Sequence, residues 1–176
     1  MFTGLSLGTV FVIYSPLQPS LYSIGGICLA LATIAIASQY KKLMKIEYFY
    51  IVSLLVEGVI FVIVIAVLLF SLNLITASLV YIGYQITFFF GSYLVRCETL
   101  LLGSKEILSK VDICKQVGYL VGLAISFIVY KWLELYLLIS ESNEQVYYMH
   151  FGLLMNQLAA IFVLYYSFDK DFKNEL

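Results

Sequence analysis

The stretch from 53 to 64, SLLVEGVIFVIV, places one carboxylate, that of Glu57, in the middle of aliphatic side chains. It belongs to an apolar run from 48 to 72. An α-helix needs about 20 apolar residues to cross the hydrocarbon core of a bilayer, which is about 30 Å thick. The run therefore predicts a membrane-spanning helix, and Glu57 is the residue whose surroundings must explain why a charge-bearing group sits there.

The composition of the whole chain predicts the same environment. Of the 176 residues, 62% are hydrophobic and only 12% are charged, whereas a soluble domain carries about a quarter charged residues on a wetted surface. The chain is therefore predicted to be an integral membrane protein in contact with the lipid bilayer. Its ten basic residues form no basic patch, which argues against a nucleic-acid partner, and its three cysteines include no C-x-x-C pair. We expect no metal and no cofactor.

Six apolar runs divide the sequence. Backbone groups in lipid must find their hydrogen bonds within the segment, so each run is predicted to be a helix. The fold class is then all-α, a polytopic transmembrane bundle of about six helices in one domain (1–168), with a polar cytoplasmic tail at 169–176. The first run starts almost at Met1 and is short, as if a longer helix had lost its first turns. The predicted helices lie near 3–16, 20–39, 48–72, 74–95, 117–139 and 146–167.

The basic residues predict the orientation of the bundle. With six crossings, nine of the ten fall on one side of the membrane and Lys131 on the other, a strong positive-inside bias. We expect both termini on the cytoplasmic side, and the inner membrane as the location. A five-crossing bundle, with residues 3–16 outside the membrane, keeps the same loop sides. The nine are Lys41, Lys42, Lys45, Arg96, Lys105, Lys110, Lys115, Lys170 and Lys173.

Small residues four apart indicate where the helices pack. In lipid, helices associate through close contact of small residues rather than through the hydrophobic effect. Gly26 and Ala30 lie on one face of the second helix, and Gly118 and Gly122 on one face of the fifth. We expect these two faces to be packing seams.

A polar stripe runs along the fourth helix and includes the one arginine of the chain. Its residues recur at intervals of three and four, which confines them to about 80° of the helix surface. The sixth helix carries Asn156 and Gln157. Lipid does not accommodate such groups, so they are expected to face one another or a water-filled cavity. The stripe consists of Tyr81, Gln85, Phe88, Ser92, Arg96 and Thr99.

Glu57 is predicted to lie near the middle of the membrane, about 13 Å from the interface marked by Tyr48. A carboxylate at that depth costs roughly 2.5–3.5 kcal/mol on insertion scales. Two arrangements lower the cost: an ion pair with Arg96, or a neutral acid hydrogen-bonded to a Ser, Tyr or Gln side chain. Its role is either that of a proton relay or substrate contact, or that of a polar group that fixes helix packing.

The segment from 93 to 130, YLVRCETLLLGSKEILSKVDICKQVGYLVGLAISFIVY, closes one helix with Arg96 and opens a glycine-containing helix after a charged linker. With six crossings and both ends inside, the chain resembles one half of a major facilitator superfamily (MFS) transporter. The loop after the second helix departs from the family. It reads SQYKKLMKI, where the family often has a Gly-x-x-x-Asp-Arg-x-Gly-Arg type motif.

This resemblance implies a transporter of two six-helix halves, with a small solute bound between them near mid-membrane. The chain would then work as a homo-oligomer, pair with a second transporter half, or form the C-terminal half of a longer protein. Glu57 would be the acid that couples protons or contacts the substrate. The further candidates for the solute or proton path are Gln85, Arg96, Tyr81, Asn156 and Gln157.

Two alternatives remain. The chain could be a non-transporting accessory subunit of a larger membrane complex, with Glu57 and Arg96 facing a partner helix. A membrane enzyme is not expected, since H-E-x-x-H, G-x-S-x-G and clusters of His or Asp are absent from the sequence. A polar stripe that lines a cavity shared with Glu57 favours transport, whereas a stripe that faces outwards favours a partner.

Overall fold

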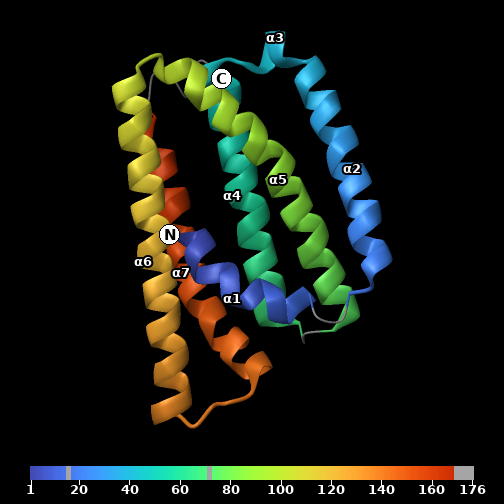
Figure 1. The fold of residues 1–176 in the computed structure, drawn as a ribbon, viewed down its shortest axis with the longest axis vertical. Coiled ribbons are helices and arrows are strands. Elements are labelled where there is room, and N and C mark those ends of the chain that lie inside the picture. Colours follow the sequence, from blue (N-terminus) through green and yellow to red (C-terminus); the bar gives the residue numbers. More distant parts are fainter. Residues whose placement is uncertain (15–16, 71–72, 169–176) are drawn as a thin grey trace.

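The computed structural model describes residues 1–14, 17–70 and 73–168, apart from the side chains of Thr3 and Phe11. Within these residues the chain forms helices and no strand (Figure 1). The polar tail predicted at 169–176 lies outside the described residues. The helices are α1 (Phe2–Tyr14), α2 (Pro19–Ser38), α3 (Tyr40–Leu43), α4 (Ile46–Leu69), α5 (Leu74–Leu102), α6 (Lys105–Tyr136) and α7 (Ser142–Ser167).

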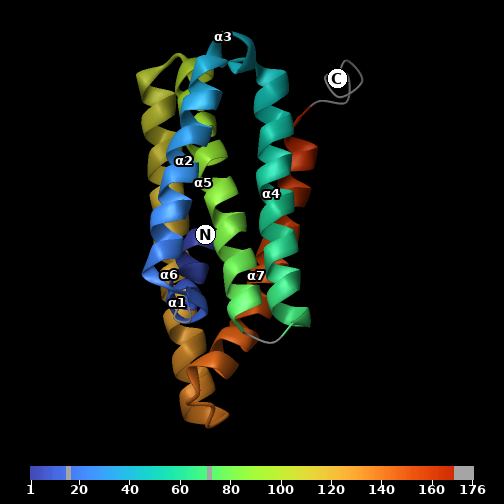
Figure 2. The ribbon, with the colours of Figure 1, turned by 90° about the vertical axis from the view of Figure 1, so that its right-hand side faces the viewer.

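Five of the described helices, α2, α4, α5, α6 and α7, are long and apolar enough to cross a membrane. They run up and down beside one another in both views of the bundle (Figures 1 and 2). Their outer faces carry large apolar side chains, such as Ile34 and Leu120, each 65% exposed. Water would disfavour so much exposed apolar surface, whereas lipid favours it. The predicted all-α membrane bundle is confirmed.

The boundary between α5 and α6 differs from the prediction. The segment 101–116, expected to be a charged connection with helices ending near 95 and resuming near 117, is helical except at Gly103 and Ser104. Gly103 ends α5 with a φ of 57°, a left-handed conformation that glycine adopts without strain. Charged residues lower hydropathy but do not interrupt a helix, and Lys115 pairs with Glu98 across the two helices at 2.6 Å.

The first helix is short, as predicted, but it does not span the bundle. Its 13 residues correspond to about 20 Å, less than the hydrocarbon core. It lies obliquely against α6 and α7, and residue 1 lies about midway along the bundle (Figures 1 and 2). Six crossings would place residue 1 at the end of the bundle that carries α3, whereas it lies away from that end (Figures 1 and 2).

Two glycines allow α1 to approach α6 closely. A Cβ atom added at Gly122 would overlap the carbonyl oxygen of Met1 and lie 3.0 Å from the amide nitrogen of Leu5. A Cβ atom at Gly4 would overlap the carbonyl oxygen of Tyr119. One at Gly118 would lie 3.2 Å from the nitrogen of Met1. The predicted packing role of Gly118 and Gly122 therefore corresponds to backbone contact between α1 and α6.

The packing face of α2 is not the predicted one. Gly26 and Ala30 are exposed, and a Cβ atom at Gly26 would meet nothing within 4 Å. Gly25 instead faces α5, where an added Cβ would overlap the hydroxyl of Tyr81. The two glycines are neighbours about 100° apart around the helix, and small residues follow on both faces, so sequence spacing alone does not select the packed face.

The helices pack in a pattern that repeats. The five most extensive helix pairs are α4 with α5, α4 with α7, α1 with α6, α1 with α7, and α2 with α5. If α1, α2 and α4 are matched with α5, α6 and α7, in that order, the five pairs correspond to one another. The pair α1–α6 corresponds to α2–α5, the pair α4–α5 corresponds to α1–α7, and the pair α4–α7 corresponds to itself. In Figure 1, α2 and α4 run in the opposite directions to their counterparts α6 and α7. The described bundle is thus arranged as two inverted groups of three.

Candidate functional site

The interior of the bundle brings Glu57 on α4 together with Gln157 on α7. Met149, Leu153 and Gln157 follow one another at intervals of four on the buried face of α7, which packs against α4. The Gln157 side chain is 0% exposed. Its Nε2 donates to the Glu57 carbonyl oxygen at 2.9 Å and to the Glu57 carboxyl Oε2. Two sequence candidates 100 positions apart thus form one polar pair.

The backbone carbonyl of Glu57 fixes how the Gln157 amide is turned. A carbonyl oxygen only accepts hydrogen bonds, so the NH₂ end of the amide faces Glu57. The Gln157 Oε1 atom then points away, where it is buried with no hydrogen-bond donor among the described residues. Leaving a buried acceptor unsatisfied costs about 1–3 kcal/mol. The site therefore combines a half-buried acid, a fixed amide donor and an unused amide acceptor.

Of the two arrangements expected for Glu57, the structure has the hydrogen bond to an amide. Arg96 is exposed on α5, and it forms no ion pair within the described part of the chain. It lies six residues before Leu102, the last residue of α5. A long cationic side chain at such a position reaches water or headgroups, so its charge is solvated without a carboxylate partner at mid-membrane.

Tyr81 and Gln85 lie at a different place, between α2 and α5. They line a cavity of about 410 Å³ whose other walls are nearly all apolar. The Tyr81 hydroxyl donates to the Tyr22 carbonyl oxygen at 3.3 Å. The Gln85 Oε1 is buried without a donor among the residues described. The apolar walls include Leu21, Ile24, Leu29, Ile82, Ile86 and Phe89.

The polar stripe of α5 therefore does not act as one surface. Its first part, Tyr81 and Gln85, is covered by α2, whereas its later residues face outwards. Ser92 and Thr99 donate to carbonyl oxygens one turn back in their own helix, at 3.3 and 2.8 Å, which satisfies their hydroxyls in an apolar setting. The expectation that the stripe faces other polar groups or water stays a prediction for these exposed residues. Glu57 does not line the Gln85 cavity.

Asn156 is separated from the acid–amide pair despite its place in the sequence. It precedes Gln157, so it points about 100° away around α7. There it lines a cavity of about 500 Å³ with Met1 and Leu5 from the first segment and Val129 from α6. The six sequence candidates thus occupy four places, of which the Glu57–Gln157 pair is the one with a direct polar contact between candidates.

A tyrosine cluster around Tyr81 was missed by sequence reasoning. The ring centroid of Tyr14 lies 5.5 Å from that of Tyr81 and 6.3 Å from that of Tyr84, both edge-on. Tyr22 lies 5.3 Å from Tyr81 and donates its hydroxyl to the Tyr14 carbonyl oxygen at 3.1 Å. These residues come from three helices, and tyrosines near helix ends are read from sequence as an interfacial belt.

Metal chemistry finds no support in the described residues. None of them form a group of three or more His, Cys, Asp or Glu side chains close enough to hold an ion. Cys28, Cys97 and Cys114 are free thiols on different helices. What the interior pair offers chemically is hydrogen bonding and exchange of a proton at one carboxyl group.

The five helices that are long and apolar enough to cross a membrane define a multi-pass integral membrane protein of the all-helical class. Comparison of the chain with protein-family models, with curated proteins and with solved structures gives no match.

Proposed function

We propose that this chain is a transporter-type membrane unit, one half of a transporter that moves a small solute together with a second half. The observation that carries the proposal is the packing pattern in which α1, α2, α4 exchange with α5, α6, α7. Inverted repeats are typical of secondary transporters, and three-plus-three inverted repeats occur within each half of MFS transporters. The second half is a second copy of this chain or another membrane chain.

In this proposal Glu57 is the acid that takes up and releases a proton. As a carboxylate it accepts from the Gln157 NH₂ group. As a neutral acid it also has an O–H to donate, and the Gln157 Oε1, which has no donor, can accept it once the amide turns over. That turn would give up the bond from Nε2 to the Glu57 carbonyl oxygen. The two protonation states of Glu57 thus favour different contacts between α4 and α7, which couples a proton to helix packing.

A second candidate is a non-transporting subunit that stabilises a larger complex. It is favoured by the outward-facing residues of α5 and by the absence of Glu57 from the cavity that Gln85 lines. Under this candidate the Glu57–Gln157 pair fixes α4 against α7, and the exposed part of the stripe meets a partner helix.

Proton movement in proteoliposomes separates the two. Liposomes loaded with the pH dye pyranine receive the protein and are challenged with pools of sugars, amino acids, carboxylates and organic cations. Transport predicts that one pool drives acidification with wild-type protein and that Glu57→Gln abolishes it. Glu134→Gln is the matched control, because Glu134 is an exposed acid paired with Lys131 at 2.6 Å. Equal signals from wild type and Glu57→Gln across all pools would refute the transport proposal and leave the structural subunit.

A further inference from the structure

The cavity between α2 and α5 lies at the lipid-facing side of the bundle. The two helices run in the same direction (Figure 1), and the cavity is lined between positions 21 and 32 of α2 and between 78 and 89 of α5. Its length is about 16 Å along the helix axes. No residue of α2 is buried, and the lining residues Ile24 and Ile82 are 57% and 59% exposed. A ligand therefore reaches this cavity from the bilayer and needs an apolar body.

The side chains of the cavity that carry oxygen or nitrogen all come from α5. Ser78, Tyr81 and Gln85 follow one another at intervals of three and four, so they lie on one face of the helix. The Ser78 hydroxyl donates to the Leu74 carbonyl oxygen at 2.7 Å. The Tyr81 hydroxyl donates to the Tyr22 carbonyl oxygen at 3.3 Å. Both hydroxyl protons are therefore used within the protein.

Gln85 is the member of this set that has no partner. Within the described part of the chain its amide makes no hydrogen bond, and its Oε1 atom is buried. A buried polar group without a partner is costly, so a ligand that bonds with this amide recovers free energy that the empty cavity lacks. The torsion that turns a glutamine amide is broad, so either the oxygen or the NH₂ group can be presented to a ligand.

The lining also selects against a charged ligand. None of the described residues that line the cavity is charged. An ionised group would lose its hydration there and gain no counter-charge, which is expensive in an apolar setting. An acyl chain of the bilayer matches the apolar walls, but it has no group that bonds with Gln85. The lining therefore favours a neutral ligand that combines an apolar body with one hydrogen-bonding group.

We propose that this cavity binds a neutral amphiphile whose polar group both donates and accepts a hydrogen bond, as a carboxamide does. The polar group pairs with the Gln85 amide, and the hydrocarbon body lies between Leu29 of α2 and Phe89 of α5. A carboxamide satisfies the oxygen and the NH₂ group of a glutamine amide together. This site is separate from the Glu57–Gln157 pair and does not depend on transport.

Photocrosslinking in proteoliposomes tests the site with two probes. Both carry a diazirine on a dodecyl chain, which ends in a carboxamide in one probe and in a methyl group in the other. Crosslinks are mapped by mass spectrometry and normalised to those on Phe162, an exposed residue of α7. In wild type, the carboxamide probe is expected to label the segments 21–32 and 78–89 about fivefold more than the methyl probe, the factor that one hydrogen bond contributes.

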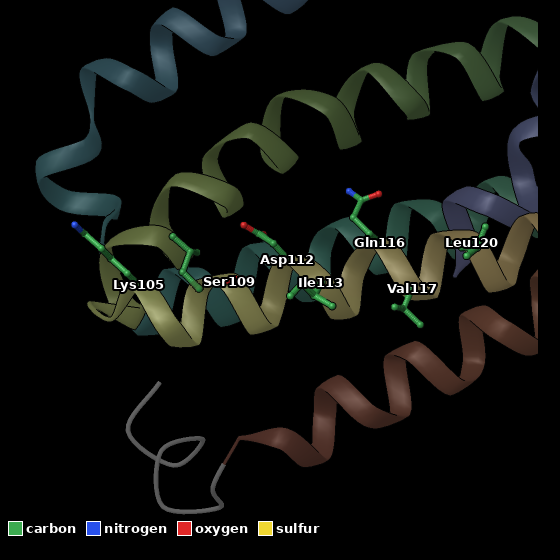
Figure 3. Close-up of a pocket in the computed structure, with 8 residues that line it drawn as sticks. Lys105, Ser109, Asp112, Ile113, Gln116, Val117 and Leu120 are labelled. Carbon is green, nitrogen blue, oxygen red and sulfur yellow. The ribbon is translucent and has the colours of Figure 1, made fainter.

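The variant Gln85→Leu should lower labelling by the carboxamide probe to the level of the methyl probe. Gln116→Leu is the matched control, because Gln116 is exposed on α6 and lines a groove formed by that helix alone, away from α2 (Figure 3). It should leave the labelling of both segments unchanged.

A second pair of variants tests the hydrocarbon part of the site. Ala32→Phe fills the cavity and should reduce labelling by both probes, whereas Ala35→Phe should not, because Ala35 is exposed on the same helix and does not line the cavity. Equal labelling by the two probes in wild type would overturn the proposal, because an acyl chain of the bilayer would then be the occupant. Equal effects of Gln85→Leu and Gln116→Leu, or no crosslinks in either segment, would overturn it as well.

Discussion

Replacing Gly122 by alanine tests the close crossing of α1 and α6. The added Cβ would overlap the Met1 carbonyl oxygen and lie 3.2 Å from the Gly4 Cα atom. Because these are backbone atoms, no side-chain rotation relieves the overlap, and the two helices must move apart. Overpacking costs about 1–3 kcal/mol, and backbone overlap falls in the upper part of that range.

The alanine also stabilises the helix itself, and this gain in free energy offsets part of the loss from the overlap. In a helix interior, alanine is favoured over glycine by about 1 kcal/mol. The net change for Gly122→Ala is then a loss of about 1–2 kcal/mol, or about 2–8 °C in Tm for a chain of this size. Gly152→Ala on α7 is the matched control, because its Cβ would meet nothing within 4 Å. It should leave Tm unchanged or raise it by about 2–4 °C.

The buried thiol of Cys97 supplies the assay. It is 0% exposed, whereas Cys28 and Cys114 are exposed, so a thiol-reactive dye in a Cys28→Ser, Cys114→Ser background reports unfolding in detergent. Gly122→Ala is expected to melt below wild type and Gly152→Ala at or above it. A Gly122→Ala protein as stable as Gly152→Ala would refute the placement of α1 against α6.

Three further substitutions have expected signs. Gln157→Leu removes two hydrogen bonds to Glu57 but also a buried acceptor that has no donor, so the net loss of unfolding free energy should be about 1 kcal/mol. The exchange Glu57→Gln with Gln157→Glu should recover part of that loss if the pair itself matters, and no recovery on dye melting would contradict the pairing. Gln85→Leu removes a buried acceptor without a donor and should leave Tm unchanged or raise it, whereas a fall of several degrees would show that Gln85 has a partner. Lys115→Gln should cost less than about 1 kcal/mol and lose its effect at high salt, because its pair with Glu98 is partly exposed; a salt-independent loss would contradict this.

Much of the fold is predictable because lipid imposes simple length rules. The runs around Glu57 and those in α2 and α7 correspond to observed helices within a few residues. The α5–α6 turn was misplaced because hydropathy reports where a helix leaves the membrane, not where it ends. The true end is marked by Gly103, a residue whose left-handed conformation becomes evident with the backbone.

The site was predictable in its residues but not in its pairing. Glu57 and Gln157 each stand out as polar groups in apolar runs, yet their contact depends on how α4 and α7 are rotated against each other. Arg96, the other expected partner, is exposed near the end of α5 and does not pair with Glu57. The choice of Gly25 over Gly26 has the same cause, since rotation about a helix axis is fixed by tertiary packing.

The mass of the assembly in nanodiscs made directly from native membranes, for wild type and Glu57→Gln side by side, tests the transporter proposal most directly. The account predicts two copies of the 20.0 kDa chain, or one copy with a second polytopic chain, and the same assembly in Glu57→Gln because the acid acts in proton exchange. A single chain alone in both proteins would contradict the account, since one half by itself cannot enclose a solute between two halves.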